Sequence, residues 1–351
     1  MSRTLAFLSL LISICIAPAA HAEAFITVRL SYKVILRGSD GQRPDGVTEA
    51  GIDQAIADMN ALHQSYGRGY RFVRVDPIIE VGGLGEFQRP SPGYYCFREM
   101  FQNTVEHSNM LADATANPGM YAWNSDAVNI YINNNNVAGT CVFPSRQLSV
   151  IGPTASSQAE VTLDEIGHYF NLCHTHGCQC GCCDPFEEGT CNTVPGDDNV
   201  LDTLPDLPCW TSNEIAEHNF GVDFADLSPQ QQEQVRDVFF NIMSFHGRNC
   251  GTSISGVSRL TERQLNRWAD AASTGSNHVC DGQTHFIDAG FNGVETGRSA
   301  NPYNRVAEGL AAATGGWDIL MIRGGNYFEN LTISAPVTLR TPRGQLARIG
   351  Q

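Results

Sequence analysis

The sequence predicts an α+β fold, in which a domain with a twisted mixed sheet and several helices precedes a smaller segment of short strands. Three observations predict it. Residues 25–36 alternate apolar and polar types and are rich in β-branched side chains, as in a strand. Residues 48–65 have apolar residues at helical spacing, and residues 70–75 return to a strand pattern. After residue 271 short apolar runs separated by turn residues replace the helical pattern.

The helices of the first domain are predicted from periodicity and from their end signals. The helix at 48–65 has one apolar face, made of Ile52, Ile56, Met59 and Leu62. A second helix is expected at 226–240, because Pro229 stands near its first turn. A third is expected at 261–272, with Thr261 as its cap. Residues 126–132 and 147–152 are predicted to be further strands, and residues 181–208 a long loop.

The segment at 161–177, VTLDEIGHYFNLCHTHG, has the spacing of a metal-binding helix. Asp164 and His168 stand four residues apart, so their side chains lie one above the other on one helical face and can bind one ion. Glu165 follows the first of them, where a carboxylate can take a proton from water at the ion.

A third donor, His174, can reach the same ion only if the helix ends sharply after His168. Such an ending needs a residue with positive φ, for which glycine is most suitable and asparagine next. Asn171 stands at this position, so we predict a left-handed turn there.

The zinc-protease pattern that this segment resembles is HExxHxxGxxH, and Asp164 stands where its first histidine belongs. Aspartate binds zinc through oxygen, but its side chain is shorter and charged, and it makes the ligand set harder. Water on such an ion would be less acidic. His176 is a candidate substitute ligand. The sequence does not choose between these two ligands.

Residues 24–275 resemble a pappalysin-type metzincin. Four elements carry the resemblance: DEIGHYFNLCHTH, the acidic loop GDDNVLDTLPD at 196–206, the Met-turn NIMSF, and RLTERQLNRW at 259–268. The resemblance implies Glu165 as general base and zinc on His168 and His174, with Asp164 in the first ligand position. It implies Met243 as the hydrophobic floor of the site. Phe245 stands where this family often has tyrosine, so a hydroxyl role is absent there.

The function that this resemblance implies is that of a secreted zinc metalloendopeptidase acting on protein or peptide substrates. The strand at 126–132 would then lie at the cleft edge and pair with an extended substrate, although a plain sheet strand fits the sequence equally. Asp164 supports an alternative, a catalytically impaired metzincin that acts as an extracellular binding or adhesion module.

Export is predicted from residues 1–22, which have one Arg3, an apolar run and small residues before Glu23, as in a secretory signal. The run is too short to span a bilayer. We therefore expect a secreted, extracellular protein, or a periplasmic one in a bacterium. The formal net charge of −15 disfavours nucleic acid and anionic membranes as partners.

Twelve cysteines are present, and cleavage of the signal segment would remove Cys15. Export favours disulfides, and the odd number that remains leaves at least one unpaired thiol or an intermolecular bond. The dense run at 173–191, CHTHGCQCGCCDPFEEGTC, could instead hold a second metal. In the acidic loop, Asp197, Asp198 and Asp202 offer hard oxygen ligands for calcium, and a solvated loop is the alternative.

The end of the chain is expected to form a separate unit after a linker at 272–283. Residues 284–351 resemble the opening of a pectin-lyase-type parallel β-helix, with a short helix at 301–313. The strand-like runs expected in it are 319–322, 331–333 and 337–340. These few coils are too short for a polysaccharide groove, so we expect the open end to dock on the first domain or on a protein or carbohydrate partner.

Overall fold

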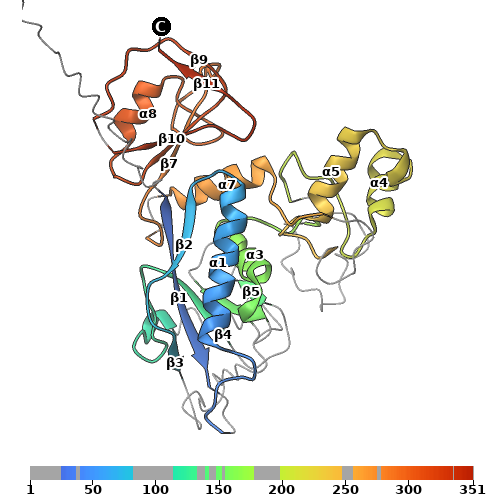
Figure 1. The fold of residues 1–351 in the computed structure, drawn as a ribbon, viewed down its shortest axis with the longest axis vertical. Helices are drawn as coiled ribbons and strands as arrows, with labels where there is room; N and C mark the ends of the chain where they lie inside the picture. Colours follow the sequence, from blue (N-terminus) through green and yellow to red (C-terminus); the bar gives the residue numbers. More distant parts are fainter. Residues whose placement is uncertain are drawn as a thin grey trace, which may run out of the picture.

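The computed structural model describes residues 25–36, 40–81, 114–132, 139–141, 148–151, 155–177, 198–246, 256–274, 278–334 and 336–350. Within them the chain has an α/β part built on one sheet and a C-terminal part of short strands (Figure 1). A lobe containing α4 and α5 lies to the side of the sheet (Figure 1). No helix in the described ranges is both long and apolar enough to cross a membrane.

The main sheet has six strands in the order β2-β1-β4-β6-β5, with β3 pairing the far end of β1. All pairs are parallel except β5 with β6, so the sheet is mixed, as expected. The strands are β1 (Ile26–Ile35), β2 (Tyr70–Arg74), β3 (Ile79–Val81), β4 (Val128–Ile132), β5 (Gly139–Cys141) and β6 (Leu148–Ile151). The four strands predicted in this region are confirmed, and β3 and β5 were not expected.

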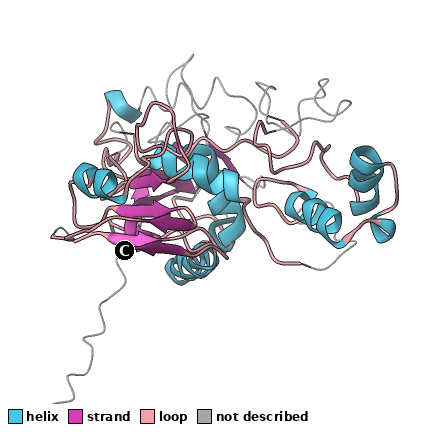
Figure 2. Ribbon diagram, turned by 90° about the horizontal axis from the view of Figure 1, so that it is seen from above, coloured by secondary structure: helices cyan, strands magenta, loops and turns pink. Residues whose placement is uncertain are grey.

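Two helices, α1 (Glu49–Ser65) and α3 (Ala159–Tyr169), pack together on the sheet (Figures 1 and 2). Thr48 caps α1 by accepting a hydrogen bond of 3.0 Å from the amide of Gly51. The helix buries Ile52, Ile56 and Met59 in the main core, together with residues of β1 and β2, as its periodicity predicted. This packing holds α3, which carries the candidate ligands, against a rigid sheet.

Three further helices follow: α4 (Ser212–Phe220), α5 (Pro229–Phe239) and α7 (Glu262–Ala272). The helix α7 begins where the sequence predicted, after its cap Thr261, whereas α5 begins at Pro229, three residues after the predicted start at 226. Both helices have capping boxes, on Ser228 and Thr261. The helix α4 was missed, although Thr211 and Glu214 form a capping box and Gly221 ends the helix in a left-handed conformation. Those two signals could have located it.

The C-terminal part contains β7 (Thr284–Ile287), α8 (Val306–Ala312), β8 (Ile319–Ile322), β9 (Gly325–Tyr327), β10 (Thr338–Arg340) and β11 (Ala347–Ile349). Two small parallel sheets result, β7-β8-β10 and β9-β11. Alternate residues of β8 pack into two different hydrophobic cores. Ile319 and Met321 belong to the main core, whereas Leu320 and Ile322 pack in a core within the C-terminal part. The two parts of the chain are therefore joined by apolar packing.

The strands expected at 319–322 and 337–340 are confirmed within one residue, but the one expected at 331–333 is wrong. Leu331 only packs against the small core, and Ile333 is about half exposed. The strand that pairs with β11 is β9 instead, because Gly325–Tyr327 provides the register that places Tyr327 in the core. Residues 278–281 lie along β1: the amide of Arg29 donates to the carbonyl of Val279, and the amide of Thr27 donates to Asp281.

Candidate metal centre

The helix α3 ends in the sharp turn that the sequence predicted. Asn171 has a φ of 68°, in the left-handed region. The amide of Leu172 donates to the carbonyl of Gly167 at 2.9 Å, and that of Asn171 donates to the carbonyl of His168 at 3.0 Å. This pair of hydrogen bonds is the Schellman arrangement, which reverses the chain at a helix end. The reversal carries the following residues back over the helix.

Three of the predicted ligands meet in one place as a result. The Nε2 atoms of His168 and His174 are 3.0 Å apart, and Nε2 of His174 is 3.8 Å from Oδ2 of Asp164. One donor atom from each residue lies within 4.8 Å of the other two, and all three side chains are buried. In the described part of the chain this is the one group of three or more such residues that could hold an ion.

The donor spacing fits a tetrahedral zinc ion. Ligand atoms about 2.0 to 2.2 Å from one zinc lie about 3.3 to 3.6 Å apart. The His168–His174 and His174–Asp164 separations of 3.0 and 3.8 Å lie on either side of this range, and the Asp164–His168 separation is within 4.8 Å. Asp164 therefore reaches the site although its side chain is shorter than that of histidine. Glu165, the next residue on α3, is also buried.

The ring of His168 is oriented by the turn that follows it. Its Nδ1 lies 2.8 Å from the carbonyl oxygen of Leu172, to which an Nδ1–H donates. This hydrogen bond leaves the lone pair of Nε2 directed toward Asp164 and His174, as in metal-binding histidines whose second nitrogen is held by a carbonyl.

Met243 lies directly beneath α3 and is fully buried. Its backbone carbonyl accepts a hydrogen bond of 2.9 Å from the amide of Thr175, the residue after His174. Its own amide donates to Oδ1 of Asn241 at 2.9 Å, and the side chain of Asn241 donates to Gln264 on α7. The turn at 241–244 is therefore linked to the ligand loop and to α7 at once.

His176 and Phe245 both contact the ring of His174. The His176 ring stacks on it at 5.0 Å between centroids, and the Phe245 ring lies at 4.6 Å. Burial is the first cause that lowers the pKa of His176, to about 2, so its ring is neutral. His176, the candidate substitute ligand, is not in the group of converging donors. Phe245 gives this wall of the site a ring without a hydroxyl.

A buried carboxylate below the ligand loop was missed by the sequence reasoning. Oδ2 of Asp206 accepts a hydrogen bond of 3.1 Å from Oγ1 of Thr175 and another of 2.5 Å from Nε2 of His246. Both Asp206 and His246 are fully buried. Burial raises the pKa of the Asp206 carboxyl, and His246 opposes that shift. The sequence could not predict this pair, because the two residues are forty positions apart and come together only in the folded structure.

The acidic loop is engaged in protein contacts. Asp198 accepts hydrogen bonds from the amide of Val200, from Thr203 and from Gln264. Asp202 accepts from Thr261 and from the amide of Arg263, both at the start of α7. Among the residues that the structure describes, these carboxylates form no group suited to calcium. Asp197 lies outside the described ranges.

Two cysteines in the described ranges, Cys173 next to His174 and Cys209, are disulfide-bonded. Cys280 is a free thiol, and burial raises its pKa. The cysteine run at 178–191 and the signal segment at 1–22 lie outside the described residues.

The solved structures to which the chain is similar include two of mirolysin. No protein-family model matches it, and no curated protein matches it. One structure is mirolysin in complex with compound 9, at 15% sequence identity and a TM-score of 0.45, covering 74% of this chain and 96% of that one. The other is mature mirolysin of Tannerella forsythia in complex with a cleaved peptide, at 14% identity and a TM-score of 0.44, covering 74% and 95%.

Proposed function

We propose that the chain is a secreted zinc-dependent metalloendopeptidase. The observation that carries this proposal is the convergence of Asp164, His168 and His174, whose donor atoms have the spacing of a single tetrahedral ion. A helix, a left-handed turn and a buried methionine turn are all needed to produce it. A chance cluster of surface residues would not be buried and braced in this way.

Zinc held by these residues would supply a Lewis acid that polarises the scissile carbonyl and acidifies water. The residues of the chain do the rest. Glu165 is the general base that takes the proton of the attacking water and passes it to the leaving amine. The hydrogen bond from His168 to Leu172 fixes the tautomer, and Met243 supports α3 from below. Residues 1–22 would direct export. The expectation that the strand at 126–132 lies at the cleft edge is wrong, because β4 pairs with β1 on one side and with β6 on the other and has no free edge for an extended substrate.

Two features favour a second function, an extracellular binding module with impaired catalysis. Phe245 contacts His174, so this wall lacks a hydroxyl that could stabilise charge on a substrate. The carboxylate of Asp164 also lowers the net positive charge at the ion. Both features would reduce turnover without preventing the fold.

We also propose that residues 284–350 form the first coils of a parallel β-helix. Its support is the stacking of β7, β8 and β10 in one parallel sheet and of β9 and β11 in another. A solenoid of so few coils is poorly stabilised by its own packing. A protein or carbohydrate partner bound at this end would cover its last coil.

The test is the zinc content and casein hydrolysis of the purified mature protein, measured beside Asp164→His and Glu165→Gln. About one zinc per chain, with chelator-sensitive hydrolysis lost in Glu165→Gln, supports the peptidase. Zinc-free, inert protein that gains both properties in Asp164→His supports the binding module. Absence of zinc from both forms would overturn the metal site itself.

A further inference from the structure

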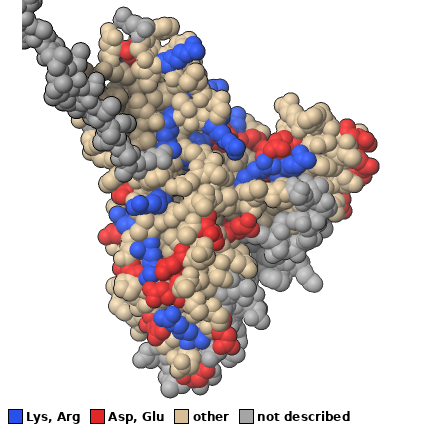
Figure 3. Space-filling view, viewed as in Figure 1, with Lys and Arg blue, Asp and Glu red and all other residues tan. Residues whose placement is uncertain are grey.

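A buried carboxylate of the acidic loop begins a series of hydrogen bonds that ends at the methionine turn. Acidic side chains lie at the surface of the sheet-bearing part and of the α4–α5 lobe, where arginines are interspersed with them (Figure 3). Asp198 is buried instead, with 1% of its surface exposed. A carboxylate is costly to bury without hydrogen-bond donors, so the donors around Asp198 indicate its role in the fold.

The first link in this series is Gln264 on α7, which is fully buried. Its Nε2 donates to Oδ2 of Asp198 at 2.9 Å. Its Oε1 accepts hydrogen bonds from the amide of Thr261 at 3.0 Å and from Nδ2 of Asn241 at 2.9 Å. An ionised carboxylate can only accept and a backbone N–H can only donate, so Asp198 and Thr261 together permit one orientation of the Gln264 amide.

The second link is Asn241, at the start of the methionine turn. It presents its Nδ2 to Oε1 of Gln264, and the same group donates to the carbonyl of Asp237 at 2.9 Å. Its Oδ1 therefore faces the amide of Met243, which donates to it at 2.9 Å. We call the four residues Asp198, Gln264, Asn241 and Met243 the amide relay. Each donor in it meets an acceptor, and reversing either side-chain amide would bring two donors together.

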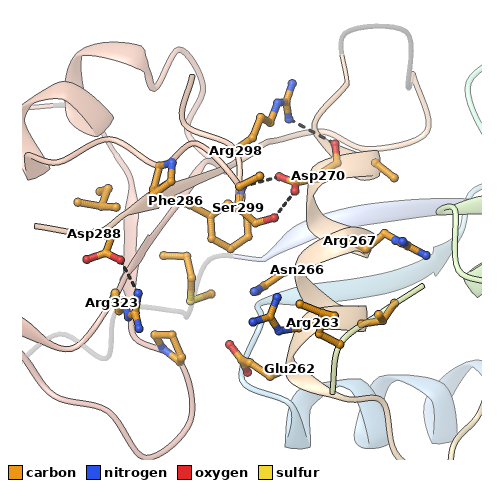
Figure 4. A pocket seen from close by; sticks show the side chains of 18 of the residues that line it. Glu262, Arg263, Asn266, Arg267, Asp270, Phe286, Asp288, Arg298, Ser299 and Arg323 are labelled. Carbon is orange, nitrogen blue, oxygen red and sulfur yellow. Dashed lines mark hydrogen bonds and ion pairs between the residues drawn. The ribbon is translucent and has the colours of Figure 1, made fainter. Parts of the chain in front are cut away.

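The helix that carries Gln264 is fixed from its other side. Figure 4 shows Asp270 of α7 hydrogen-bonded to Ser299 in the C-terminal part. The amide of Ser299 donates to Oδ1 of Asp270 at 2.9 Å, and the guanidinium of Arg298 donates to the backbone carbonyls of Asp270 and Ser273. The helix α7 is therefore a fixed support, against which the amide relay holds the methionine turn.

The end of the relay contacts the neighbours of both histidine ligands. The carbonyl of Met243 accepts a hydrogen bond of 2.9 Å from the amide of Thr175, the residue after His174. The side chain of Met243 lies beneath Gly167, the residue before His168. A change in the orientation of the turn therefore reaches two of the three converging donors.

We propose that Asp198 and Gln264 are positioning residues of the metal centre. Asp198 sets the orientation of the Gln264 and Asn241 amides, and these amides hold Met243 against the two histidine ligands. Neither Asp198 nor Gln264 is among the converging donors, so both act through the turn. This role rests on the proposed metal site, but it also predicts a change in the turn that is measured without metal.

The first variant is Asp198→Asn, which keeps the size of the side chain and exchanges one acceptor for a donor. Its Oδ1 can still accept from Val200 and Thr203, so its Nδ2 faces Nε2 of Gln264 and the two donors repel. We expect zinc affinity to fall about tenfold, as for outer partners of metal ligands. The visible spectrum of the cobalt-substituted chain, which reports ligand geometry, should change as well.

The matched control is Asp202→Asn, which removes the same charge from the same loop. Asp202 accepts from Thr261 and from the amide of Arg263 at the start of α7, but it is not part of the relay. We expect this variant to keep the native zinc affinity and the native cobalt spectrum. Melting curves of all variants verify that each is folded.

The second readout uses the metal-free chain labelled with ¹³C-methyl methionine. The Met243 methyl signal is assigned by its absence in Met243→Leu. Asp198→Asn should shift this signal, and Asp202→Asn should not. Gln264→Leu, which interrupts the relay, should shift it too. The double variant of Asp198→Asn with Gln264→Leu should bind zinc no more weakly than Gln264→Leu alone, because Asp198 acts through Gln264.

Three results would overturn the proposal: an unmoved Met243 signal in Asp198→Asn and Gln264→Leu, additive losses of zinc affinity in the double variant, or equal changes in Asp202→Asn. If the native chain binds neither zinc nor cobalt, the proposed peptidase function fails, and the metal-free methyl spectra still decide whether the relay holds the turn. If Asp198→Asn does not fold, Gln264→Leu provides both readouts.

Discussion

The sulfur of Met243 occupies the space that a side chain on Gly167 would need. A Cβ atom placed on Gly167 would lie 2.5 Å from Sδ and 3.2 Å from Cε of Met243. The helix that carries the candidate ligands therefore rests directly on the methionine turn, one residue before His168. We therefore expect a change in this contact to move His168.

Gly167→Ala should displace Met243 or lift α3. Overpacking of this kind costs about 1 to 3 kcal/mol, and the shift should weaken zinc binding as well. Urea unfolding and competitive zinc titration measure the two effects. The control is Gly119→Ala, because a Cβ there has no atom within 4 Å. Native zinc affinity in Gly167→Ala would mean that the contact does not position the ligands.

Asn171 should be replaceable by glycine but not by valine. Its φ of 68° is strained for a β-branched residue, whereas glycine adopts it freely. We expect Asn171→Gly to keep zinc affinity and stability. Asn171→Val should lose about 1 to 2 kcal/mol and bind zinc more weakly, because His174 no longer returns to His168. Equal melting temperatures and equal zinc affinities for the two variants would contradict this.

The ligand frame could be predicted because it depends on local rules: the spacing of Asp164 and His168 on a helix, and the left-handed preference of Asn171. The roles of Asp198 and Asp202 could not. Their carboxylates meet α7 residues about sixty positions later, and no local pattern separates such a contact from a calcium loop. The prediction of a strand at 331–333 was wrong for a related reason. Pairing with β11, and not composition, decides which segment is a strand, and β11 pairs with Gly325–Tyr327.

The pair of Asp206 and His246 should contribute to both stability and metal binding. Removing one partner leaves the other polar group buried, which costs about 3 to 5 kcal/mol for buried pairs. His246→Leu should therefore be strongly destabilising, and the double variant with Asp206→Leu should lose less than the two single changes combined. Chemical denaturation measures this cycle. Additive losses would show that the two side chains do not interact.

Asp206→Asn tests the link to the metal separately, since its amide oxygen can still accept from Thr175. We expect only a small loss of stability and near-native zinc affinity. Thr175→Val, which removes that hydrogen bond beside His174, should bind zinc more weakly. Zinc affinity equal to that of the native chain in Thr175→Val would assign the pair to the fold alone.

His63 should make the protein sensitive to acid. The side chain is fully buried among Tyr70, Phe72 and Trp268, and burial, with a smaller contribution from Arg68, lowers its pKa to about 3. Because the ordinary value of 6.5 applies to the unfolded chain, the unfolded chain takes up the proton first as the pH falls.

The stability linked to His63 is therefore present above pH 6.5 and is lost between pH 6.5 and about 3, by up to about 1.4 kcal/mol per pH unit. His63→Leu should flatten this part of the curve of unfolding free energy against pH, and His218→Leu, on the exposed face of α4, should not. Urea unfolding at intervals from pH 7 to pH 4 measures the slopes. An unchanged slope in His63→Leu would mean that His63 is protonated inside the folded core, which its aromatic surroundings oppose because they offer no acceptor for a second N–H.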